Sequence, residues 1–154
     1  MPQLTRARDH LRRSVALDSN DPEPRLRLVH VLLELNDIAG AEKEFAGGDW
    51  SRATPAFVYI ARLLEGTLRE RQRDPAAAAR SYDAAITLAP QAQSARIARS
   101  HLAHMTGARS DAAAFALEAI TSADRGSDPW WLYSKGLVWR MGGYLDRQRQ
   151  LVRR

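Results

Sequence analysis

The chain of 154 residues contains no cysteine, and all but two of its 23 basic residues are arginines. Without cysteine, the protein has no disulfide bond, no thiolate nucleophile and no cysteine-based metal site. The longest apolar stretch, Leu28 to Leu35, is interrupted by His30 and Glu34 and is far shorter than the roughly 20 residues that span a bilayer. Aromatic residues make up only 7% of the chain, and the remaining composition, 45% hydrophobic and 27% charged, is that of one globular domain.

Motifs for catalysis or export are also missing. The N-terminal segment, MPQLTRARDHLRR, lacks the apolar core of a secretory signal, so the default expectation is a cytoplasmic location. The sequence has no phosphate-binding loop, no GxSxG or HExxH motif and no nucleophile placed beside a base. We therefore expect a protein that is not an enzyme, with no catalytic residue, cofactor or metal.

A repeat is the clearest positive feature of the chain. Four alanines, Ala7, Ala41, Ala78 and Ala112, recur at intervals of 34, 37 and 34 residues. In each case the residues four and seven positions later lie on the same helical stripe, where small side chains let a neighbouring helix approach closely. A period of about 34 residues built from two helices is typical of stacked helical repeats.

A second helical pattern precedes three of these alanines, over residues 25–36, 56–71 and 94–106, with apolar residues at three- and four-residue spacing. Thr54-Pro55, Asp74-Pro75 and Asp128-Pro129 each place an N-cap side chain before a proline at the first helical position. The sequence therefore predicts an all-α protein of about nine helices arranged as antiparallel pairs.

These pairs make the whole chain, residues 1–154, one repeat domain. We expect a half repeat at 3–17, repeats at about 24–48, 56–90 and 93–123, and an atypical terminal pair at 129–154. The terminal pair keeps the phase of the repeat, so we expect it to stack on the array and cover its last apolar face. The first helix has no partner before it, which predicts a homodimer contact there or a chain cut from a longer array.

Residues Tyr59 to Pro90 carry the repeat pattern most fully. Gly66 precedes Ala78 by twelve residues, Tyr82 and Ala85 follow, and Pro90 closes the unit. In this pattern nearly the whole chain resembles the tetratricopeptide repeat (TPR) family. The resemblance implies a right-handed superhelix, an α-solenoid whose first helices line a concave groove for a peptide or a partner's helix, and it implies no catalysis.

Equivalent positions of the first helices would then form three ladders along the groove. The first contains Leu26, Leu63, Ile97 and Trp131, the second His30, Thr67, His101 and Lys135, and the third Leu33, Glu70, His104 and Val138. Such a groove is partly apolar and weakly basic, and it suits an acidic or amphipathic segment. In the alternative interpretation, Leu26, Leu63 and Ile97 simply pack between helices.

The histidines of the predicted groove argue against two specific kinds of site, a carboxylate clamp and a metal site. A TPR subclass grips a C-terminal carboxylate with lysine, asparagine and arginine, but here His30, Thr67 and His101 stand in the matching region, so that clamp is not preserved. His101 and His104 lie three residues apart and could meet one metal ion. No carboxylate lies one turn away on the same helix, so we interpret both as surface or groove histidines.

The preferred hypothesis is a protein–protein interaction module, an adaptor or scaffold. One alternative is arginine-mediated binding of nucleic acid or anionic surfaces. Aromatic residues do not alternate with the basic runs as they do in base-stacking platforms, so nucleic acid is the less favoured partner. The basic runs that carry this arginine-mediated alternative are Arg6, Arg8, Arg12 and Arg13 at one end and Arg147, Arg149, Arg153 and Arg154 at the other. A further alternative is a purely structural, self-associating domain.

Overall fold

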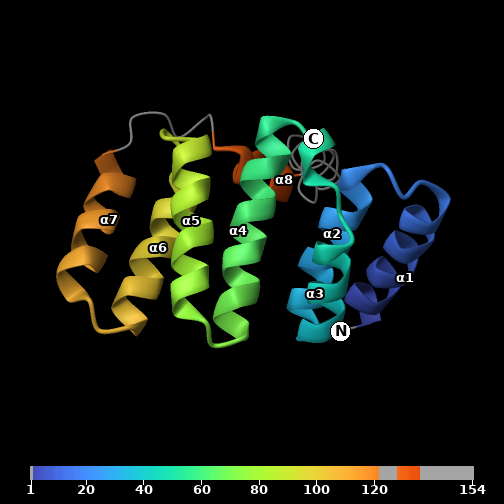
Figure 1. The fold of residues 1–154 in the computed structure, drawn as a ribbon, viewed down its shortest axis with the longest axis horizontal. Coiled ribbons are helices and arrows are strands. Elements are labelled where there is room, and N and C mark those ends of the chain that lie inside the picture. The colour runs from blue at the N-terminus through green and yellow to red at the C-terminus, as the bar shows by residue number, and fades with distance from the viewer. Residues whose placement is uncertain (1, 122–127, 136–154) are drawn as a thin grey trace, which may run out of the picture.

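The computed structural model describes residues 2–121 and 128–135, and all regular structure in these two ranges is helical. Figure 1 shows the helices standing side by side in a row from α1 to α7, which confirms the predicted TPR-like α-solenoid. In chain order they are α1 (Pro2–Leu17), α2 (Pro22–Glu34), α3 (Ile38–Ala46), the short 3-10 helix η1 (Trp50–Arg52), α4 (Pro55–Arg71), α5 (Pro75–Leu88), α6 (Ser94–Met105), α7 (Arg109–Thr121) and α8 (Pro129–Lys135).

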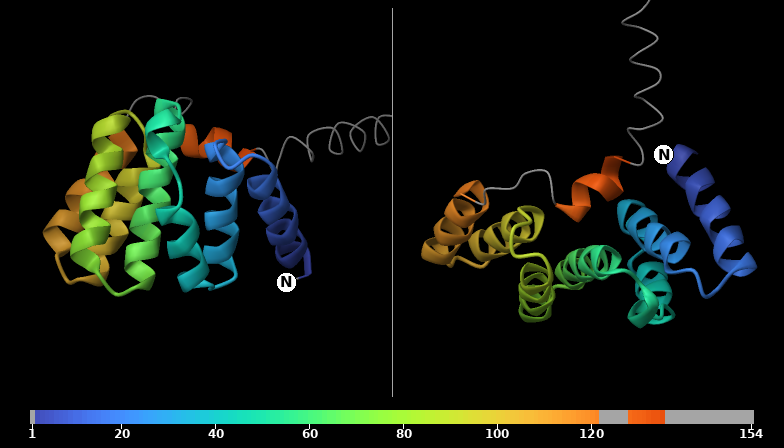
Figure 2. Two further views of the ribbon diagram at one scale, coloured as in Figure 1. Left: turned by 45° about the vertical axis from the view of Figure 1, so that its right-hand side comes forward. Right: turned by 90° about the horizontal axis from the view of Figure 1, so that it is seen from above.

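The row of helices is curved. Seen from above in Figure 2, α2, α4 and α6 face the concave side, and α3 and α5 lie behind them. The short helix α8 lies on the concave side and contacts α4, behind which it is seen in Figure 1. The curvature therefore places the first helix of each pair, and α8 with it, on one shared face.

Helix starts follow the cap residues read from the sequence. Thr54, Asp74 and Asp128 each accept a hydrogen bond from a backbone N–H two or three residues further on, which confirms all three predicted pairs of cap and proline. A fourth pair, Asp21-Pro22, was missed. Because Asp21 accepts from the N–H of Glu23, α2 begins at Pro22 and not at residue 25.

The turn between the two helices of a pair has the same backbone geometry three times. At each turn one residue adopts the left-handed conformation, and the N–H of the next residue bonds to the carbonyl five positions before it. This geometry satisfies carbonyls that the end of the first helix leaves unpaired. The left-handed residues are Asn36, Arg73 and Gly107, with φ of 59°, 62° and 84°, each five positions before a repeat alanine.

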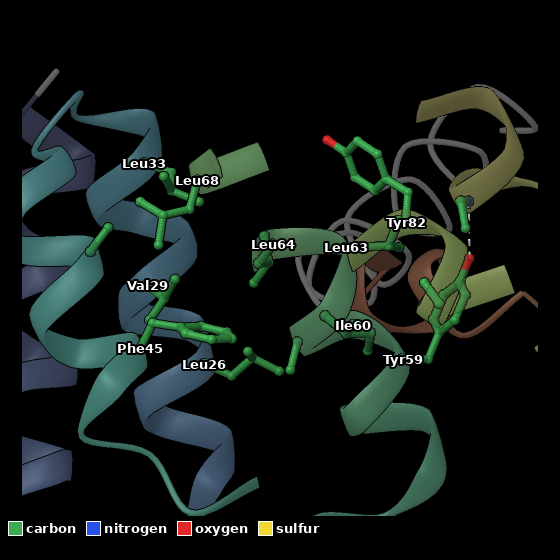
Figure 3. Close-up of a cluster of buried hydrophobic side chains, with 14 of the residues drawn as sticks. Leu26, Val29, Leu33, Phe45, Tyr59, Ile60, Leu63, Leu64, Leu68 and Tyr82 are labelled. Atoms are coloured by element: carbon green, nitrogen blue, oxygen red, sulfur yellow. Dashed lines mark hydrogen bonds between the residues drawn. The ribbon is translucent and has the colours of Figure 1, made fainter. Parts of the chain in front are cut away.

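The core is densest in the middle of the row. Ala41 and Ala78 are completely buried, and α4 and α5 form the most extensively packed pair. A Cβ atom on Gly66 would lie well inside van der Waals distance of the Tyr82 ring, so the ring packs directly on the backbone of α4. Figure 3 shows this cluster joining α2 and α3 on one side to α4 and α5 on the other.

One correction concerns the stripe that starts at Ala41. We expected Gly48 to lie on this helical stripe, but α3 ends at Ala46 and Gly48 lies beyond it. The indole of Trp50 packs on the Phe45 ring at 5.2 Å between centroids, and its N–H donates to the Phe45 carbonyl at 3.2 Å. This ring covers the end of α3 where another turn of helix would lie.

A larger correction concerns the terminal unit. We expected residues after Asp128 to stack on α7, but α8 packs chiefly against α4, on the concave side. Leu117 and Ile120 of α7 remain exposed. The predicted second helix of this pair lies outside the described residues. The prediction used only the 34-residue interval between repeats. This interval carries no information about the contacts with α4 that hold α8 on the concave side.

The left-handed turn can be tested at two of its three positions. This conformation costs a residue other than glycine about 1 kcal/mol, so Arg73→Gly should raise the free energy of unfolding by up to about 1 kcal/mol. Gly107→Ala should lower it by a similar amount, because open space surrounds that position and only φ is strained. Urea denaturation measures both variants. If both substitutions changed the free energy of unfolding in the same direction, the two turns would not share the left-handed geometry described above.

Candidate functional site

A cavity of about 410 Å³ opens on the concave side, between α4, α6 and α8. Its volume falls within the range of about 300 to 1,000 Å³ that is usual for ligand sites. Six of the predicted groove residues meet in its lining: Leu63, Thr67, Glu70, Ile97, His101 and Trp131. Leu64, Tyr82, Ser94, Ala98 and Trp130 complete it.

The polar part of the cavity centres on Glu70. The Tyr82 hydroxyl donates to Glu70 Oε1 at 2.6 Å, and the Thr67 hydroxyl lies 3.5 Å from the same Tyr82 oxygen. Burial, and then the bond to Glu70, raise the pKa of Tyr82, so this hydroxyl keeps its proton and remains a donor. The glutamate is therefore held in one place at the wall of the cavity.

The apolar part of the cavity is open to solvent. Ile97 is 53% exposed and Trp131 is 42% exposed, two of the few large hydrophobic side chains in the described residues that are not covered. Tryptophan is among the residues that contribute most to binding energy at protein interfaces. A partner that covers these two side chains would gain the free energy of removing their surface from water.

The α2 end of the concave side is covered by α8. The His30 ring packs against the rings of Trp130 and Tyr133, at 5.4 and 5.8 Å between centroids, and the Arg27 guanidinium lies over Tyr133 at 4.9 Å. Burial lowers the pKa of His30; Glu34 opposes this shift and Arg27 adds to it. His30 is therefore part of the seat of α8 and not an open groove residue.

Asp128 fixes the start of α8 to the start of α6. Its side chain is completely buried, and one oxygen accepts from the N–H groups of Gln93 and Ser94 at 3.0 and 2.8 Å. The other oxygen accepts from the N–H of Trp130 at 2.9 Å. Because α6 has no side-chain cap among its own residues, one carboxylate caps both helices.

Tyr59 links this carboxylate to the centre of the row. Its hydroxyl accepts from the N–H of Ala95 at 3.3 Å, and burial, followed by the adjacent Asp128 carboxylate, raises the pKa of Tyr59. The sequence identified Asp128 as the cap of α8. Its second role was missed because the two amides of α6 lie 34 and 35 residues away in the chain.

The remaining predicted groove residues do not join the cavity. Leu26 and Leu33 belong to the buried core, which corrects the prediction that they line the groove, because the face of α2 that carries them packs inside the array. His104 is exposed but does not line the cavity. Lys135 ends α8, its side chain lies outside the described part of the structure, and so does Val138.

Within residues 2–121 and 128–135, no three histidine, aspartate or glutamate side chains gather closely enough to hold a metal ion. None of the helices there has both the length and the apolar character needed to cross a membrane.

The packing of His30 makes the attachment of α8 sensitive to acid. The pKa of His30 in the folded protein lies below its ordinary value of about 6.5, so the unfolded chain binds this proton more readily. The free energy of unfolding should therefore fall as the pH drops from neutral through about 6.5. His30→Phe, which keeps an aromatic ring against Trp130, should reduce this fall. Thermal denaturation between about pH 7.5 and 5.5 measures the fall, and equal slopes in the unmodified chain and the variant would contradict the assignment.

Comparison with known proteins supports the fold. No protein-family model matches the sequence, and a search of curated proteins found no match. Among solved structures, the one described as MamA MSR-1 C2, of a TPR-containing protein, superposes with a TM-score of 0.63 at 17% sequence identity. The match covers 81% of this chain and 70% of that chain. At this identity the likeness concerns the fold alone, and the chain has a TPR-like helical-repeat fold.

Proposed function

We propose that the protein is a non-enzymatic interaction module of the TPR type, an adaptor or scaffold whose concave side binds a peptide or helix of a partner protein. The position of α8 carries this proposal. A short helix already lies against the inner helices, with Trp130 and Tyr133 on His30 and its first turn capped by Asp128. The concave side is therefore a surface that accepts a helical segment.

The physics of such binding favours a rigid array. The helices that line the surface are folded before a partner arrives, so little ordering entropy is lost in the scaffold on binding.

The arginine-mediated alternative is weakened at seven described arginines, each of which pairs with a carboxylate. Of the predicted N-terminal run, Arg8 is one of these seven, whereas Arg6, Arg12 and Arg13 are exposed. An arginine that already pairs with a carboxylate has less net charge to offer a phosphate. The basic run after α8 lies outside the described residues. The arginines paired with a carboxylate are Arg8, Arg25, Arg27, Arg62, Arg69, Arg96 and Arg99.

A homodimer through α1 stays a prediction. No residue of α1 is buried, and among the described helices its extensive packing is against α2. Leu17 at its end is 89% exposed. Light scattering at several concentrations distinguishes a dimer from a monomer.

Peptides selected from a random library against the full chain test the proposed surface. Ile97→Asp places a charge in the apolar wall of the cavity and should weaken the selected peptides at least about tenfold, a loss of about 1.4 kcal/mol. Met105→Asp is the matched control, because Met105 lies on the same helix, is also exposed and does not line the cavity.

Fluorescence polarisation with the labelled peptides measures both affinities. The control should stay within about twofold of the unmodified chain. Peptides that bind both variants and the unmodified chain equally would contradict binding at the concave side.

A further inference from the structure

The cavity beside α8 differs in charge from the chain as a whole. The formal net charge of the protein is +5, yet among the described residues that line the cavity Glu70 is the one carboxylate, and no arginine or lysine accompanies it. The other ionisable side chains of this described lining are His101 and Tyr82. In a basic protein, the concave side thus holds a local negative site.

Within the described part of the chain, Glu70 is positioned by a hydrogen bond and not by an ion pair. The Tyr82 hydroxyl, a neutral donor, orients the carboxylate and leaves its negative charge in place. Other glutamates of the array, Glu42, Glu44 and Glu65, each pair with an arginine. No ion pair found among the described residues includes Glu70, so its carboxylate is free to pair with a cation that a partner brings.

Other walls of the same cavity are apolar and aromatic. Leu63 and Ile97 line one part of the cavity, and Trp131 presents a ring that is 42% exposed. An arginine side chain has an apolar stem and a planar cationic head that pairs with carboxylates and stacks on aromatic rings. An acidic side chain would meet the like charge of Glu70 in the same space.

We propose that this cavity binds an arginine side chain of the partner segment, whose guanidinium pairs with Glu70 while its stem lies against Ile97 and Trp131. The inference rests on the proposed function and specifies its partner as basic and amphipathic. It replaces the acidic segment expected from the sequence, because Glu70 brings a negative charge to the cavity, whereas of the three predicted groove histidines His101 alone lines it.

Small probes test the cavity without knowledge of the partner. N-acetyl-arginine amide and N-acetyl-citrulline amide have nearly the same shape, and only the first carries a charge. The full, ¹⁵N-labelled chain should show saturable shifts of the backbone amides around Glu70 with the arginine compound. The citrulline compound should bind about tenfold more weakly, because a bond to a charged partner is about 1 to 2 kcal/mol stronger than a neutral one.

Three variants locate the effect. Glu70→Gln keeps an acceptor for Tyr82 and should reduce the affinity for the arginine probe to that for citrulline, and Trp131→Ala should weaken both probes. Glu65→Gln is the control, since Glu65 pairs with Arg62 and does not line this cavity, and it should leave both affinities unchanged. If Glu70→Gln unfolds, the affinities of the two probes for the unmodified chain and for Trp131→Ala still show whether the cavity prefers the charged side chain.

Equal affinity for the two probes, no saturable shift with either, or an affinity for arginine that Glu70→Gln leaves unchanged would overturn the inference. None of these results affects the proposed function, because peptides selected against the chain would still depend on Ile97. Conversely, peptides that do not depend on Ile97 would remove the proposed function while the probes still report on the cavity itself.

Discussion

The placement of α8 depends on the buried carboxylate of Asp128. A charged group that leaves water costs several kcal/mol unless hydrogen bonds replace its solvent, and here three backbone N–H groups from two helices supply them. The first N–H groups of a helix have no partners within it and carry partial positive charge, so one carboxylate serves both α6 and α8. This shared cap holds the C-terminal segment on the concave side, and the geometry of the cavity follows from it.

Local chemistry explains most of what the sequence could predict about the fold. Cap and proline pairs act within three residues, and the period of small residues such as Ala41 and Ala78 reflects direct helix contact, so both features can be read from the chain. The recurrence of left-handed residues at Asn36, Arg73 and Gly107 was not predicted, because asparagine and arginine do not mark that conformation as glycine does. The period of the alanines nevertheless locates the same three turns.

The site was less predictable, because its determinants lie far apart in the chain. Ladder positions on α4 and α6 did reach one cavity, since those two helices keep the register of the repeat. On α2 the same register failed: Leu26 and Leu33 are buried, and His30 lies under Trp130 and Tyr133. The bond from Tyr82 to Glu70, which positions the carboxylate at the cavity wall, joins residues of two helices and leaves no pattern in the sequence.

The cavity and its proposed partner require α8 to lie against α2 and α4 and not to continue the row beyond α7. Nuclear Overhauser spectroscopy of the full chain measures this directly, since the rings of His30 and Trp130 are 5.4 Å apart between centroids. We predict cross-peaks between the imidazole protons of His30 and the indole protons of Trp130. Cross-peaks from Trp130 to Leu117 and Ile120 of α7, with none to His30, would contradict it.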